Sequence, residues 1–375
     1  MGIARCVRPD FFVRLRIPDE AGNVLRNIMR NLFRPAGLLA LVWMATAAAA
    51  GFGSDVAGTR AAFLKLIDRT RVELAPQAST PVVDNGVSTE KFTFASDAEQ
   101  RVPGYLEKPA RLQGRGAAVI VLHGTGGRKE SSQDTVAALV RAGFIGVAID
   151  GRYHGARTKA GSGAAEYNDA IVRAWRTGTE HPFYYDTVWD VMRLIDYLET
   201  RDDVDATRVG LIGFSKGGIE TYFAAAADPR IACAVPCIGV QSFRWALDNG
   251  QWKARIATIQ DAFDSIAARE GQKNPGPDFV RKFYARVVPG IDGEFDGPAM
   301  LPLIAPRPLL VINGDSDANT PLAGVRLAVA AARPVYTAAG ADEKLVLRIQ
   351  ENTPHRVNPD SMDAAIAWFV RWLRP

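Results

Sequence analysis

The sequence predicts an α/β fold with a mostly parallel central sheet, helices on both faces of that sheet and a helical insertion. Three observations lead to this prediction. From residue 117 onward, short apolar runs alternate with stretches of helical periodicity, the pattern of parallel strands joined by crossover helices. The stretch Arg208–Gly218 passes from such a run through a glycine-containing turn into a helical pattern. The segment 239–306, which follows the next apolar run, shows no strand character.

The length and composition limit the classes of protein to consider. With 375 residues the chain could form one large domain or two average ones, and its 47% hydrophobic and 23% charged residues are ordinary for a globular protein. The formal net charge of +4 lies within residues 1–50, which carry seven arginines and three acidic residues. The rest is neutral, so we expect no nucleic-acid partner. The chain has three cysteines and no CxxC, HExxH or cysteine–histidine cluster, and we expect no metal and no cofactor.

Residues 1–50 are expected to form an N-terminal extension that precedes the folded domain, 51–375. Met29 begins a segment typical of a secretory signal peptide, with two arginines, an apolar run and the small residues Ala48-Ala49-Ala50 at its end. We therefore expect translation to start at Met29 and the protein to be secreted or periplasmic, with no stable membrane span in the mature chain. The alternative is an uncleaved anchor, although the apolar run is shorter than the roughly 20 residues that span a bilayer.

The folded domain begins with a different pattern from the one that follows. Residues 55–76 show amphipathic helical periodicity, and alternation at 91–94 and 101–106 predicts two strands of a meander. Further strands are expected at 117–122, 144–149, 208–212, 231–236, 309–313 and 344–350. Helices are expected between them at 132–142, 185–199, 219–227, 321–332 and 361–373.

The candidate nucleophile is Ser215. The stretch Gly213-Phe214-Ser215-Lys216-Gly217 fits the G-x-S-x-G pattern, in which a serine occupies the tight turn between a strand and a helix. The glycines are needed because strand and helix lie too close for a Cβ. Such a short pattern can occur by chance, but the strand expected before it and the helix expected after it strengthen the match.

The candidate base is His355. The chain has four histidines, and His355 alone follows Ser215. In sheets of this type the partners follow in the order serine, acid, histidine. His355 comes directly after the last expected strand, at the C-terminal edge of the sheet where Ser215 also lies.

Two aspartates qualify as the acid that orients the histidine. Asp315 and Asp317 both follow the strand expected at 309–313, and a carboxylate there would also stabilise the imidazolium cation. Asp315 stands early in the turn, where a bond to the backbone is its ordinary role. We favour Asp317 and keep Asp315 as the alternative.

Two backbone N–H groups are candidates for an oxyanion hole. One belongs to Lys216, the residue after the nucleophile, and the other to Thr125 in His123-Gly124-Thr125-Gly126-Gly127. The glycines beside Thr125 would let its backbone approach a ligand. His123 is expected to be structural. A phosphate-binding loop is the alternative for this segment, but no GK[ST] or dinucleotide motif follows it.

Other charged residues near these motifs are expected to have ordinary roles. Asp150 and His154 suggest a metal site at first sight, but no further ligands occur at a suitable spacing. We expect the two residues to tether the loop after the strand 144–149. The side chains of Arg152 and Lys216 are expected at the solvated surface.

Together these motifs resemble the serine α/β-hydrolases, in particular the dienelactone hydrolase and acetyl xylan esterase group, which is similar to the catalytic domain of prolyl oligopeptidase-type peptidases. The resemblance covers roughly residues 90–375. It rests on HGTGG at 123–127, DGRYHG at 150–155, GFSKGG at 213–218, APRPLLVINGDSD at 305–317 and the TPH before the final helix. It implies an α/β-hydrolase fold and a Ser-Asp-His triad, and its G-x-x-D pattern again indicates Asp317. Lys216 differs from the apolar or amide side chain of many such esterases.

The sequence therefore predicts an enzyme that cleaves carboxylic esters, with a small-molecule ester as substrate and an acyl-enzyme on Ser215. The alternative is a serine peptidase of the prolyl oligopeptidase type. The resemblance implies that such peptidases carry a large N-terminal propeller domain, and the roughly 50 residues before the expected fold are too few to form one. A non-catalytic binding module is a third reading. The insertion 239–306 is expected to cover the serine as a lid, with Phe243, Trp245 and Trp252 as candidate substrate contacts. That lid would favour apolar or aromatic acyl groups.

Overall fold

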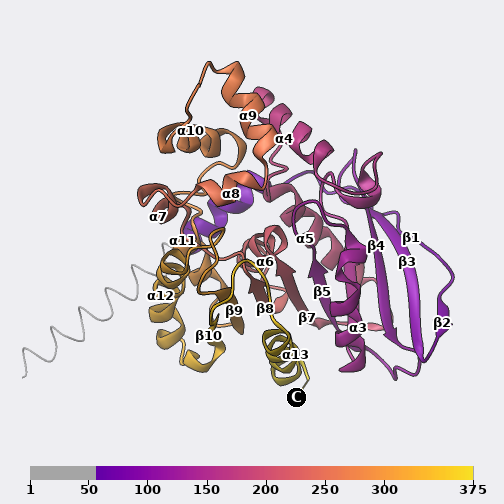
Figure 1. The fold of residues 1–375 in the computed structure, drawn as a ribbon. Helices are drawn as coiled ribbons and strands as arrows, with labels where there is room; N and C mark the ends of the chain where they lie inside the picture. Colours follow the sequence, from indigo (N-terminus) through magenta and orange to yellow (C-terminus); the bar gives the residue numbers. More distant parts are fainter. Residues whose placement is uncertain (1–55, 375) are drawn as a thin grey trace, which may run out of the picture. The chain divides into compact units, whose positions relative to one another are not determined.

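The structure is a computed structural model, and it describes residues 56–374. These residues form a ten-stranded sheet with helices packed against both of its faces (Figure 1). The strand order is β1-β3-β4-β6-β5-β7-β8-β9-β10, and β2 pairs with β3. The strands are β1 (Gln77–Ala78), β2 (Val82–Asp84), β3 (Val87–Ala95), β4 (Arg101–Pro109), β5 (Gly116–Leu122), β6 (Ile145–Ile149), β7 (Val204–Phe214), β8 (Ile231–Cys237), β9 (Leu309–Gly314) and β10 (Leu345–Gln350).

The sheet has an antiparallel edge and a parallel centre. β1, β2, β3 and β4 pair in antiparallel fashion, and β4 joins β6 in the same way. From β6 through β5, β7, β8 and β9 to β10 all neighbours are parallel. The C-terminal ends of these strands therefore meet at one edge of the sheet. This arrangement confirms the predicted α/β fold with a largely parallel central sheet.

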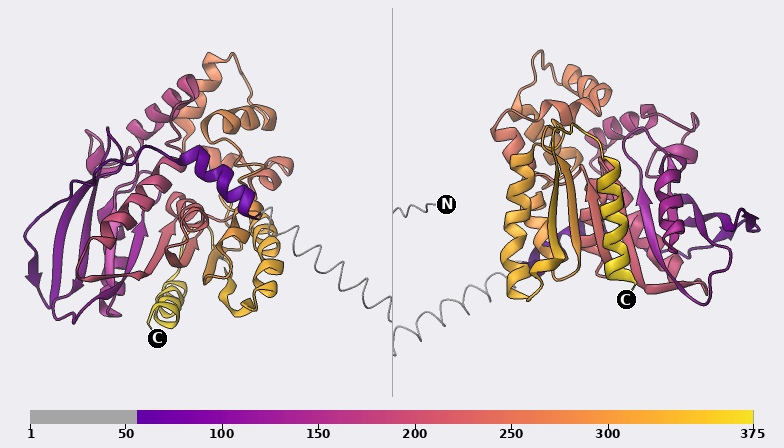
Figure 2. Two further views of the ribbon diagram at one scale, coloured as in Figure 1. Left: turned by 180° about the vertical axis from the view of Figure 1, so that it is seen from behind. Right: turned by 60° about the horizontal axis from the view of Figure 1, so that its bottom comes forward.

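Helices bury both faces of the parallel strands. Every residue of β5, β6 and β9 is buried, as expected for strands covered on two sides. The helices along the sheet are α3 (Gln133–Arg141), α5 (Tyr185–Glu199), α6 (Lys216–Ala227), α12 (Leu322–Ala338) and α13 (Pro359–Leu373), whereas α4 (Ala165–Thr177) packs against other helices. Apolar side chains of α3 and α13 form one core with the sheet, while α5, α6, α12 and the helical residues 56–67 contribute to the other. Figure 2 shows the backbone of the sheet and its helices from two further sides.

The segment between β8 and β9 contains only helices. They are α7 (Phe243–Asp248), α8 (Lys253–Ala257), α9 (Gln260–Arg269), α10 (Pro277–Val287), α11 (Gly297–Met300) and the 3-10 helix η3 (Leu301–Ile304). α9 and α10 pack against α4, so the excursion after β6 and the segment after β8 form one helical layer (Figure 1). Phe263 and Phe283 pack edge to face at the centre of this layer, with ring centroids 5.4 Å apart.

The N-terminal part differs from the expectation in two ways. The helix expected over 55–76 ends at residue 67. Beyond it the chain runs along the sheet, because the carbonyl of Leu74 accepts a hydrogen bond from the N–H of Ala95 in β3. β1 and β2 were not expected, since both are short and exposed and carry no alternating apolar pattern.

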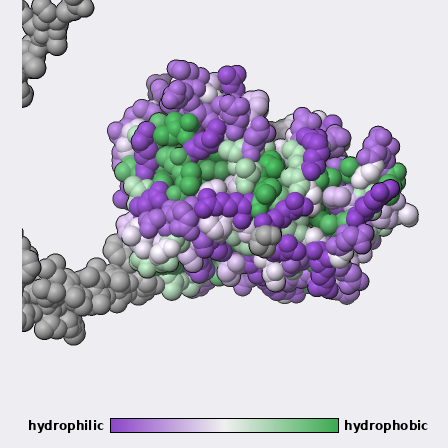
Figure 3. Space-filling model, turned by 90° about the horizontal axis from the view of Figure 1, so that it is seen from below, coloured by the Kyte–Doolittle hydropathy of each residue, from purple (hydrophilic) through white to green (hydrophobic). Residues whose placement is uncertain are grey.

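The expected signal segment, from Met29 to Ala50, lies outside the described residues. Within residues 56–374, no helix combines the length and the apolar character that crossing a membrane requires. Seen from below, the surface shows apolar residues in areas divided by hydrophilic ones (Figure 3). Among residues 56–374, the large apolar side chains that are exposed belong to β2, α12 and α13 and are Val82, Val83, Leu327 and Val370.

A buried ion cluster joins the loop after β6 to α5. The guanidinium of Arg152 donates two hydrogen bonds to Asp190, at 2.9 and 3.0 Å, and one to Asp97 at 2.7 Å. Arg157 donates a further bond to Asp190 at 2.6 Å. Burial raises the pKa of Asp190, but the charges of the two arginines outweigh it and hold the pKa below its ordinary value. Arg152, expected at the surface, is therefore a core residue, and that expectation was wrong.

Replacing Arg152 with methionine should destabilise the fold strongly. The variant leaves Asp190, which is 0% exposed, with Arg157 as its remaining ionic partner, and losing one member of a buried pair costs about 3 kcal/mol or more. Urea denaturation followed by circular dichroism measures the loss. Arg115→Met is the matched control, because Arg115 and its partner Asp202 are exposed and lie 4.0 Å apart. Equal stability of the two variants would contradict the importance of the cluster.

Candidate active site

Ser215 lies on the turn between β7 and α6 in a conformation that few side chains adopt. Its backbone has φ +55° and ψ −111°. Two glycines permit the turn: a Cβ on Gly213 would lie 2.2 Å from the carbonyl oxygen of Gly217, and one on Gly217 would lie 2.4 Å from that of Leu122. The glycines of the motif are therefore required by contact with the backbone.

The structure brings Ser215 and His355 together. His355 stands on the loop between β10 and α13, and its Nε2 lies 2.7 Å from Ser215 Oγ. Its Nδ1 lies 2.7 Å from Oδ2 of Asp317, on the loop after β9. The three side chains come from loops at the C-terminal edge of the parallel strands and form one continuous line of hydrogen bonds.

The carboxylate of Asp317 is fixed by its own loop. Oδ1 accepts the backbone N–H groups of Asn319 at 2.8 Å and Thr320 at 3.1 Å, and Oδ2 accepts the Thr320 hydroxyl at 2.5 Å. Burial raises the pKa of Asp317, but the hydrogen bonds from His355 and Thr320 and the charge of His355 outweigh it, so the pKa lies below its ordinary value. Asp317 is thus held as an ionised acceptor beside the imidazole.

Asp315 has a different place in the site. Its exposed carboxylate accepts the backbone N–H groups of Asn352 at 2.9 Å and Thr353 at 3.1 Å. Both residues belong to the loop that carries His355. Asp315 therefore ties this loop to the loop after β9, while Asp317 makes the contact with the imidazole.

The glycine-rich loop after β5 lies against Ser215. A Cβ on Gly124 would lie 3.5 Å from the carbonyl oxygen of Phe214 and 3.7 Å from the Cβ of Ser215. Lys216 is the first residue of α6, so its N–H has no acceptor within the helix. Among the loop and turn hydrogen bonds between backbone groups of residues 56–374, none has the N–H of Thr125 as donor. Both N–H groups are thus candidates to bind an oxyanion.

His123 holds this loop from beneath. Its Nδ1 lies 2.8 Å from the carbonyl oxygen of Gly124, and its Nε2 accepts the N–H of Gly151 at 3.0 Å. These contacts fit a neutral ring with the proton on Nδ1. Burial and the neighbouring ammonium of Lys216 lower the pKa of His123 to about 4, which is consistent with that form. The structural role expected for His123 agrees with these contacts.

Asp150 and His154 lie in the buried loop after β6. Asp150 accepts hydrogen bonds from the N–H and the ammonium of Lys129, at 2.7 and 2.9 Å, and from the N–H of Ala156 at 3.0 Å. His154 Nδ1 lies 2.7 Å from the carbonyl oxygen of Arg152. In the part of the chain that the structure describes, no three histidine, cysteine or acidic side chains are placed to hold a metal. Asp150 thus tethers its loop, as expected.

The side chain of Lys216 is not at the surface. It is 0% exposed and forms an ion pair with Glu220, one turn further along α6, which is 1% exposed. Its ammonium also lies 5.6 Å from the ring centroid of Tyr167. The expectation of a solvated Lys216 was therefore wrong, because it did not include a buried partner.

The candidate substrate contacts of the insertion belong largely to its core. Phe243 and Trp252 are 1% and 8% exposed and are part of the main apolar core. Phe243 packs edge to face on Tyr284, with ring centroids 5.8 Å apart. Trp245 is half-buried. Substrate contact by these three residues stays a prediction.

Sequence reasoning missed two residues that support the acid. Thr320 orients Asp317 through its N–H and hydroxyl, and an aspartate followed three residues later by threonine is a known signal for such bonds. Arg255 of α8 is buried and donates to the carbonyl oxygen of Asn319 at 3.0 Å, which ties the insertion to the acid's loop. No local pattern reveals this second contact.

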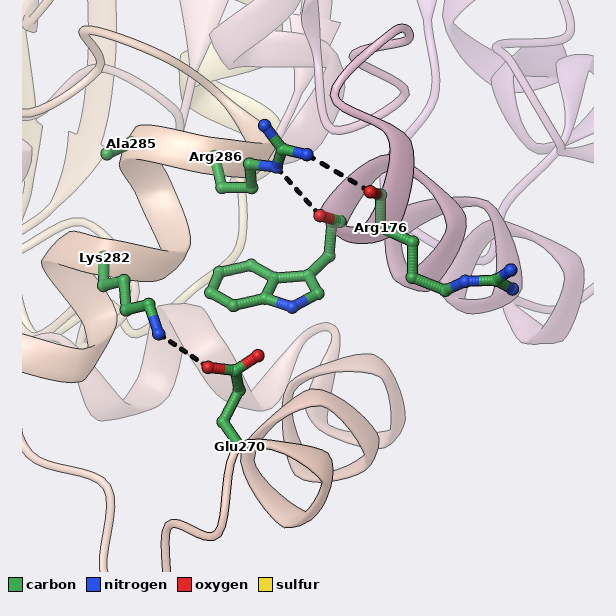
Figure 4. Close-up of a pocket in the computed structure, with 6 residues that line it drawn as sticks. Arg176, Glu270, Lys282, Ala285 and Arg286 are labelled. Carbon is green, nitrogen blue, oxygen red and sulfur yellow. Dashed lines mark hydrogen bonds and ion pairs between the residues drawn. The ribbon is translucent and has the colours of Figure 1, made fainter.

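A hollow of about 590 Å³ lies between α4 and α10 (Figure 4). Its lining does not include Ser215, Asp317 or His355. Lys282 lies over the indole of Trp175 and pairs with Glu270 at 2.6 Å, and Arg286 donates to the carbonyl oxygens of Trp175 and Arg176. Phe283 stacks on the same indole. Lys282, Glu270 and Arg286 thus bind other groups of the hollow and offer little to a ligand.

A strand, a strained serine and a helix, followed by an acid loop and a histidine loop at one edge of a parallel sheet, define the α/β-hydrolase class of serine hydrolases. Comparisons with known proteins agree. The family acetyl xylan esterase (AXE1) matches residues 71–251. YtaP of Bacillus subtilis is 24% identical over 297 residues, covering 76% of this chain and 88% of its own.

Two esterases extend the comparison. A 4-O-methyl-glucuronoyl methylesterase of Wolfiporia cocos is 26% identical over 199 residues, covering 50% of this chain and 45% of its own. The crystal structure of acetyl xylan esterase 1 from Thermoanaerobacterium sp. superposes with a TM-score of 0.63 at 18% identity, covering 86% of this chain and 94% of its own. The chain belongs to the α/β-hydrolase superfamily of serine esterases and is a carboxylic ester hydrolase. The peptidase alternative gains no support from these matches.

Proposed function

We propose that Ser215, His355 and Asp317 are the catalytic triad and that the N–H groups of Lys216 and Thr125 form the oxyanion hole. The observation that carries this proposal is the unbroken line of two 2.7 Å hydrogen bonds, from Ser215 Oγ to His355 and from His355 to Asp317. The orientation of Asp317 by its own loop adds support.

In the proposed reaction His355 takes the hydroxyl proton as Ser215 Oγ attacks the ester carbonyl carbon. The negative charge that forms on the carbonyl oxygen is stabilised by the two N–H groups. His355 then donates its proton to the leaving alcohol, and an acyl-enzyme remains. Water, deprotonated by His355, attacks the acyl carbon, and His355 returns the proton to Ser215 Oγ as the bond to the acyl group breaks and the acid leaves. Asp317 stabilises the imidazolium in both steps without taking its proton.

The substrate proposed is a carbohydrate ester with a small acyl group, acetate above all. The matched family is that of an acetyl xylan esterase, and the match includes the glycine-rich loop and Ser215. The insertion supports a small group, because its aromatic side chains pack among themselves. Phe243 and Phe283, for example, are 1% and 0% exposed, which leaves little apolar surface for a long acyl chain. This proposal replaces the apolar or aromatic acyl group expected from the sequence.

Three single substitutions test the triad. Ser215→Ala should abolish ester hydrolysis with the fold intact. Asp317→Asn should lower kcat on the order of ten-thousand-fold, because the amide stabilises the wrong state of the imidazole. Asp315→Asn weakens exposed hydrogen bonds worth about 1 kcal/mol each, so kcat should fall at most about tenfold. Steady-state kinetics on p-nitrophenyl acetate, with circular dichroism of each variant, gives the comparison. An equal loss in the two aspartate variants would contradict the assignment of the acid.

A series of p-nitrophenyl esters tests the acyl preference. We expect kcat/KM to be highest for acetate and to fall at least about tenfold by octanoate, because an acyl site without apolar depth gains nothing from added methylenes. Release of acetate from acetylated xylo-oligosaccharides should accompany this preference. Aminoacyl p-nitroanilides are the control and should not be cleaved. Faster hydrolysis of octanoate, or of a methyl glucuronate ester, would overturn the choice of substrate.

We also propose that the protein is exported and that the segment from Met29 to Ala50 is its signal peptide. The support is the order of basic, apolar and small residues in that segment. Expression from Met29 in a bacterial host should give a periplasmic or secreted protein whose N-terminus, read by sequencing, lies just after Ala50. A mature chain that still carries residues 30–50 would favour the anchor instead.

A further inference from the structure

Lys216 has a side chain that the proposed reaction does not use. Its backbone N–H is one of the two proposed oxyanion donors, while its side chain is buried and pairs with Glu220. Neither side chain is more than 1% exposed. Removing two charges from water is expensive, and such a pair is weak support for stability by itself. We therefore looked for a function of the Lys216–Glu220 pair in the candidate active site.

The ammonium of Lys216 lies where the loops after β5 and β6 meet. A Cβ on Gly151 would lie 2.9 Å from Nζ of Lys216 and 3.6 Å from Nε2 of His123. The same point is 3.4 Å from Oγ1 of Thr187. The ammonium and the imidazole thus share the small space beside Gly151, which only a glycine leaves open.

Only one protonation state of His123 allows both of its hydrogen bonds, to the carbonyl oxygen of Gly124 and from the N–H of Gly151. Its Nε2 accepts the N–H of Gly151, so this nitrogen must carry no proton. Its Nδ1 faces the carbonyl oxygen of Gly124 and must carry one. A proton added to Nε2 would set two donors against each other and break the link between the loops. The neighbour of Gly124 in the loop is Thr125, the second proposed oxyanion donor.

We propose that the buried charge of Lys216, held in place by Glu220, is a positioning device for the oxyanion loop: it keeps His123 neutral and so preserves the bonds that tie Gly124 to Gly151. Lys216 would then act twice, through its N–H on the substrate and through its ammonium on His123. The proposal rests on the role proposed above for Thr125.

The other charges around His123 do not replace Lys216. Lys129 of η1 (Lys129–Ser132) and Asp150 after β6 form an ion pair at 2.9 Å, and their charges act on the pKa of His123 in opposite directions. His154, whose ring centroid is 5.1 Å from that of His123, is kept neutral by burial and by Lys216, which lower its pKa to about 2. Lys216 is the cation whose charge acts most strongly on the ring.

The low pKa of His123 makes the stability of the fold depend on pH. The folded protein holds His123 neutral down to about pH 4, whereas the free side chain takes up a proton near pH 6.5. Between these values the folded state resists a proton that the unfolded state accepts, so this part of the stability is present above pH 6.5 and is lost as the pH falls toward 4. Without the charge of Lys216, His123 should take up its proton at a higher pH.

The test is the double variant Lys216→Met with Glu220→Leu. Changing Lys216 alone would leave Glu220 buried and unpaired, whereas an apolar pair of similar size often preserves stability. The chain has four histidines, so NMR of isotope-labelled histidine can follow each ring. We expect the pKa of His123 to rise by about one to two units. kcat relative to wild type should fall about two- to tenfold more at pH 5 than at pH 8, with KM little changed.

Arg193→Met is the matched control. Arg193 is buried on α5 and pairs with the partly buried Asp196, which Arg71 and Arg230 also contact. The loss of Arg193 should lower stability and leave the pH profile unchanged. If the apolar double variant does not fold, Lys216→Gln with Glu220→Gln makes the same test with two amides that can bind each other.

An unchanged His123 titration would overturn the proposal, and so would a kcat that falls equally at every pH. Because the titration does not depend on turnover, its outcome is separate from that of Ser215→Ala, which tests the triad.

Discussion

The tight turn from β7 into α6 is the constraint on which the active site depends. A non-glycine residue at φ +55° carries strain of about 1–3 kcal/mol, and it persists only where neighbours fix it. Here the neighbours are backbone groups: a Cβ on Gly217 would meet the carbonyl oxygen of Leu122 at 2.4 Å, and one on Gly218 would meet that of Cys237 at 2.3 Å. β5 and β8, on either side of β7, thus hold α6 against the sheet, and this contact sets the position of the Ser215 hydroxyl.

The parallel sheet brings the remaining parts to the same edge. The loops after β5, β9 and β10 all leave the C-terminal ends of their strands, so residues far apart in sequence meet without long side chains. His355 and Ser215 are 140 positions apart and still form a 2.7 Å bond. The loops are tied to one another as well as to the sheet, because Asp315 binds the histidine loop through Asn352 and Thr353. A displacement of one loop is therefore resisted by the next.

The three residues proposed as the triad, which the structure brings together, could be found in the sequence because each follows a strand with a clear apolar pattern. Ser215 and His355 could be selected from their order along the chain relative to the expected strands. Asp317 could be selected from its position in the turn after the strand 309–313. The buried charges could not be predicted in this way. Lys216 and Arg152 were expected in solvent because charged side chains are rarely buried without partners, and a pattern search does not see the partners. Glu220 is one helical turn away from Lys216, but Asp190 is 38 positions from Arg152. The contacts that bury the aromatic residues of the insertion leave no local pattern either, since they lie within a helical layer that includes α4.

The position of the Lys216–Glu220 ion pair distinguishes it from another buried ion pair, Arg152–Asp190. Arg152 and Asp190 lie among further ionic partners, Asp97 and Arg157, and this network joins a loop to a helix. Lys216 and Glu220 stand on one helix, four positions apart, so their bond joins no distant parts of the chain. The Lys216–Glu220 pair links few parts of the fold, and burying its two charges costs free energy of desolvation. We therefore explain the pair by its electrostatic effect on neighbouring groups. The field of the pair acts on His123, one residue before the loop that carries Gly124 and Thr125, and so links the charge state of the interior to the geometry of the proposed oxyanion hole.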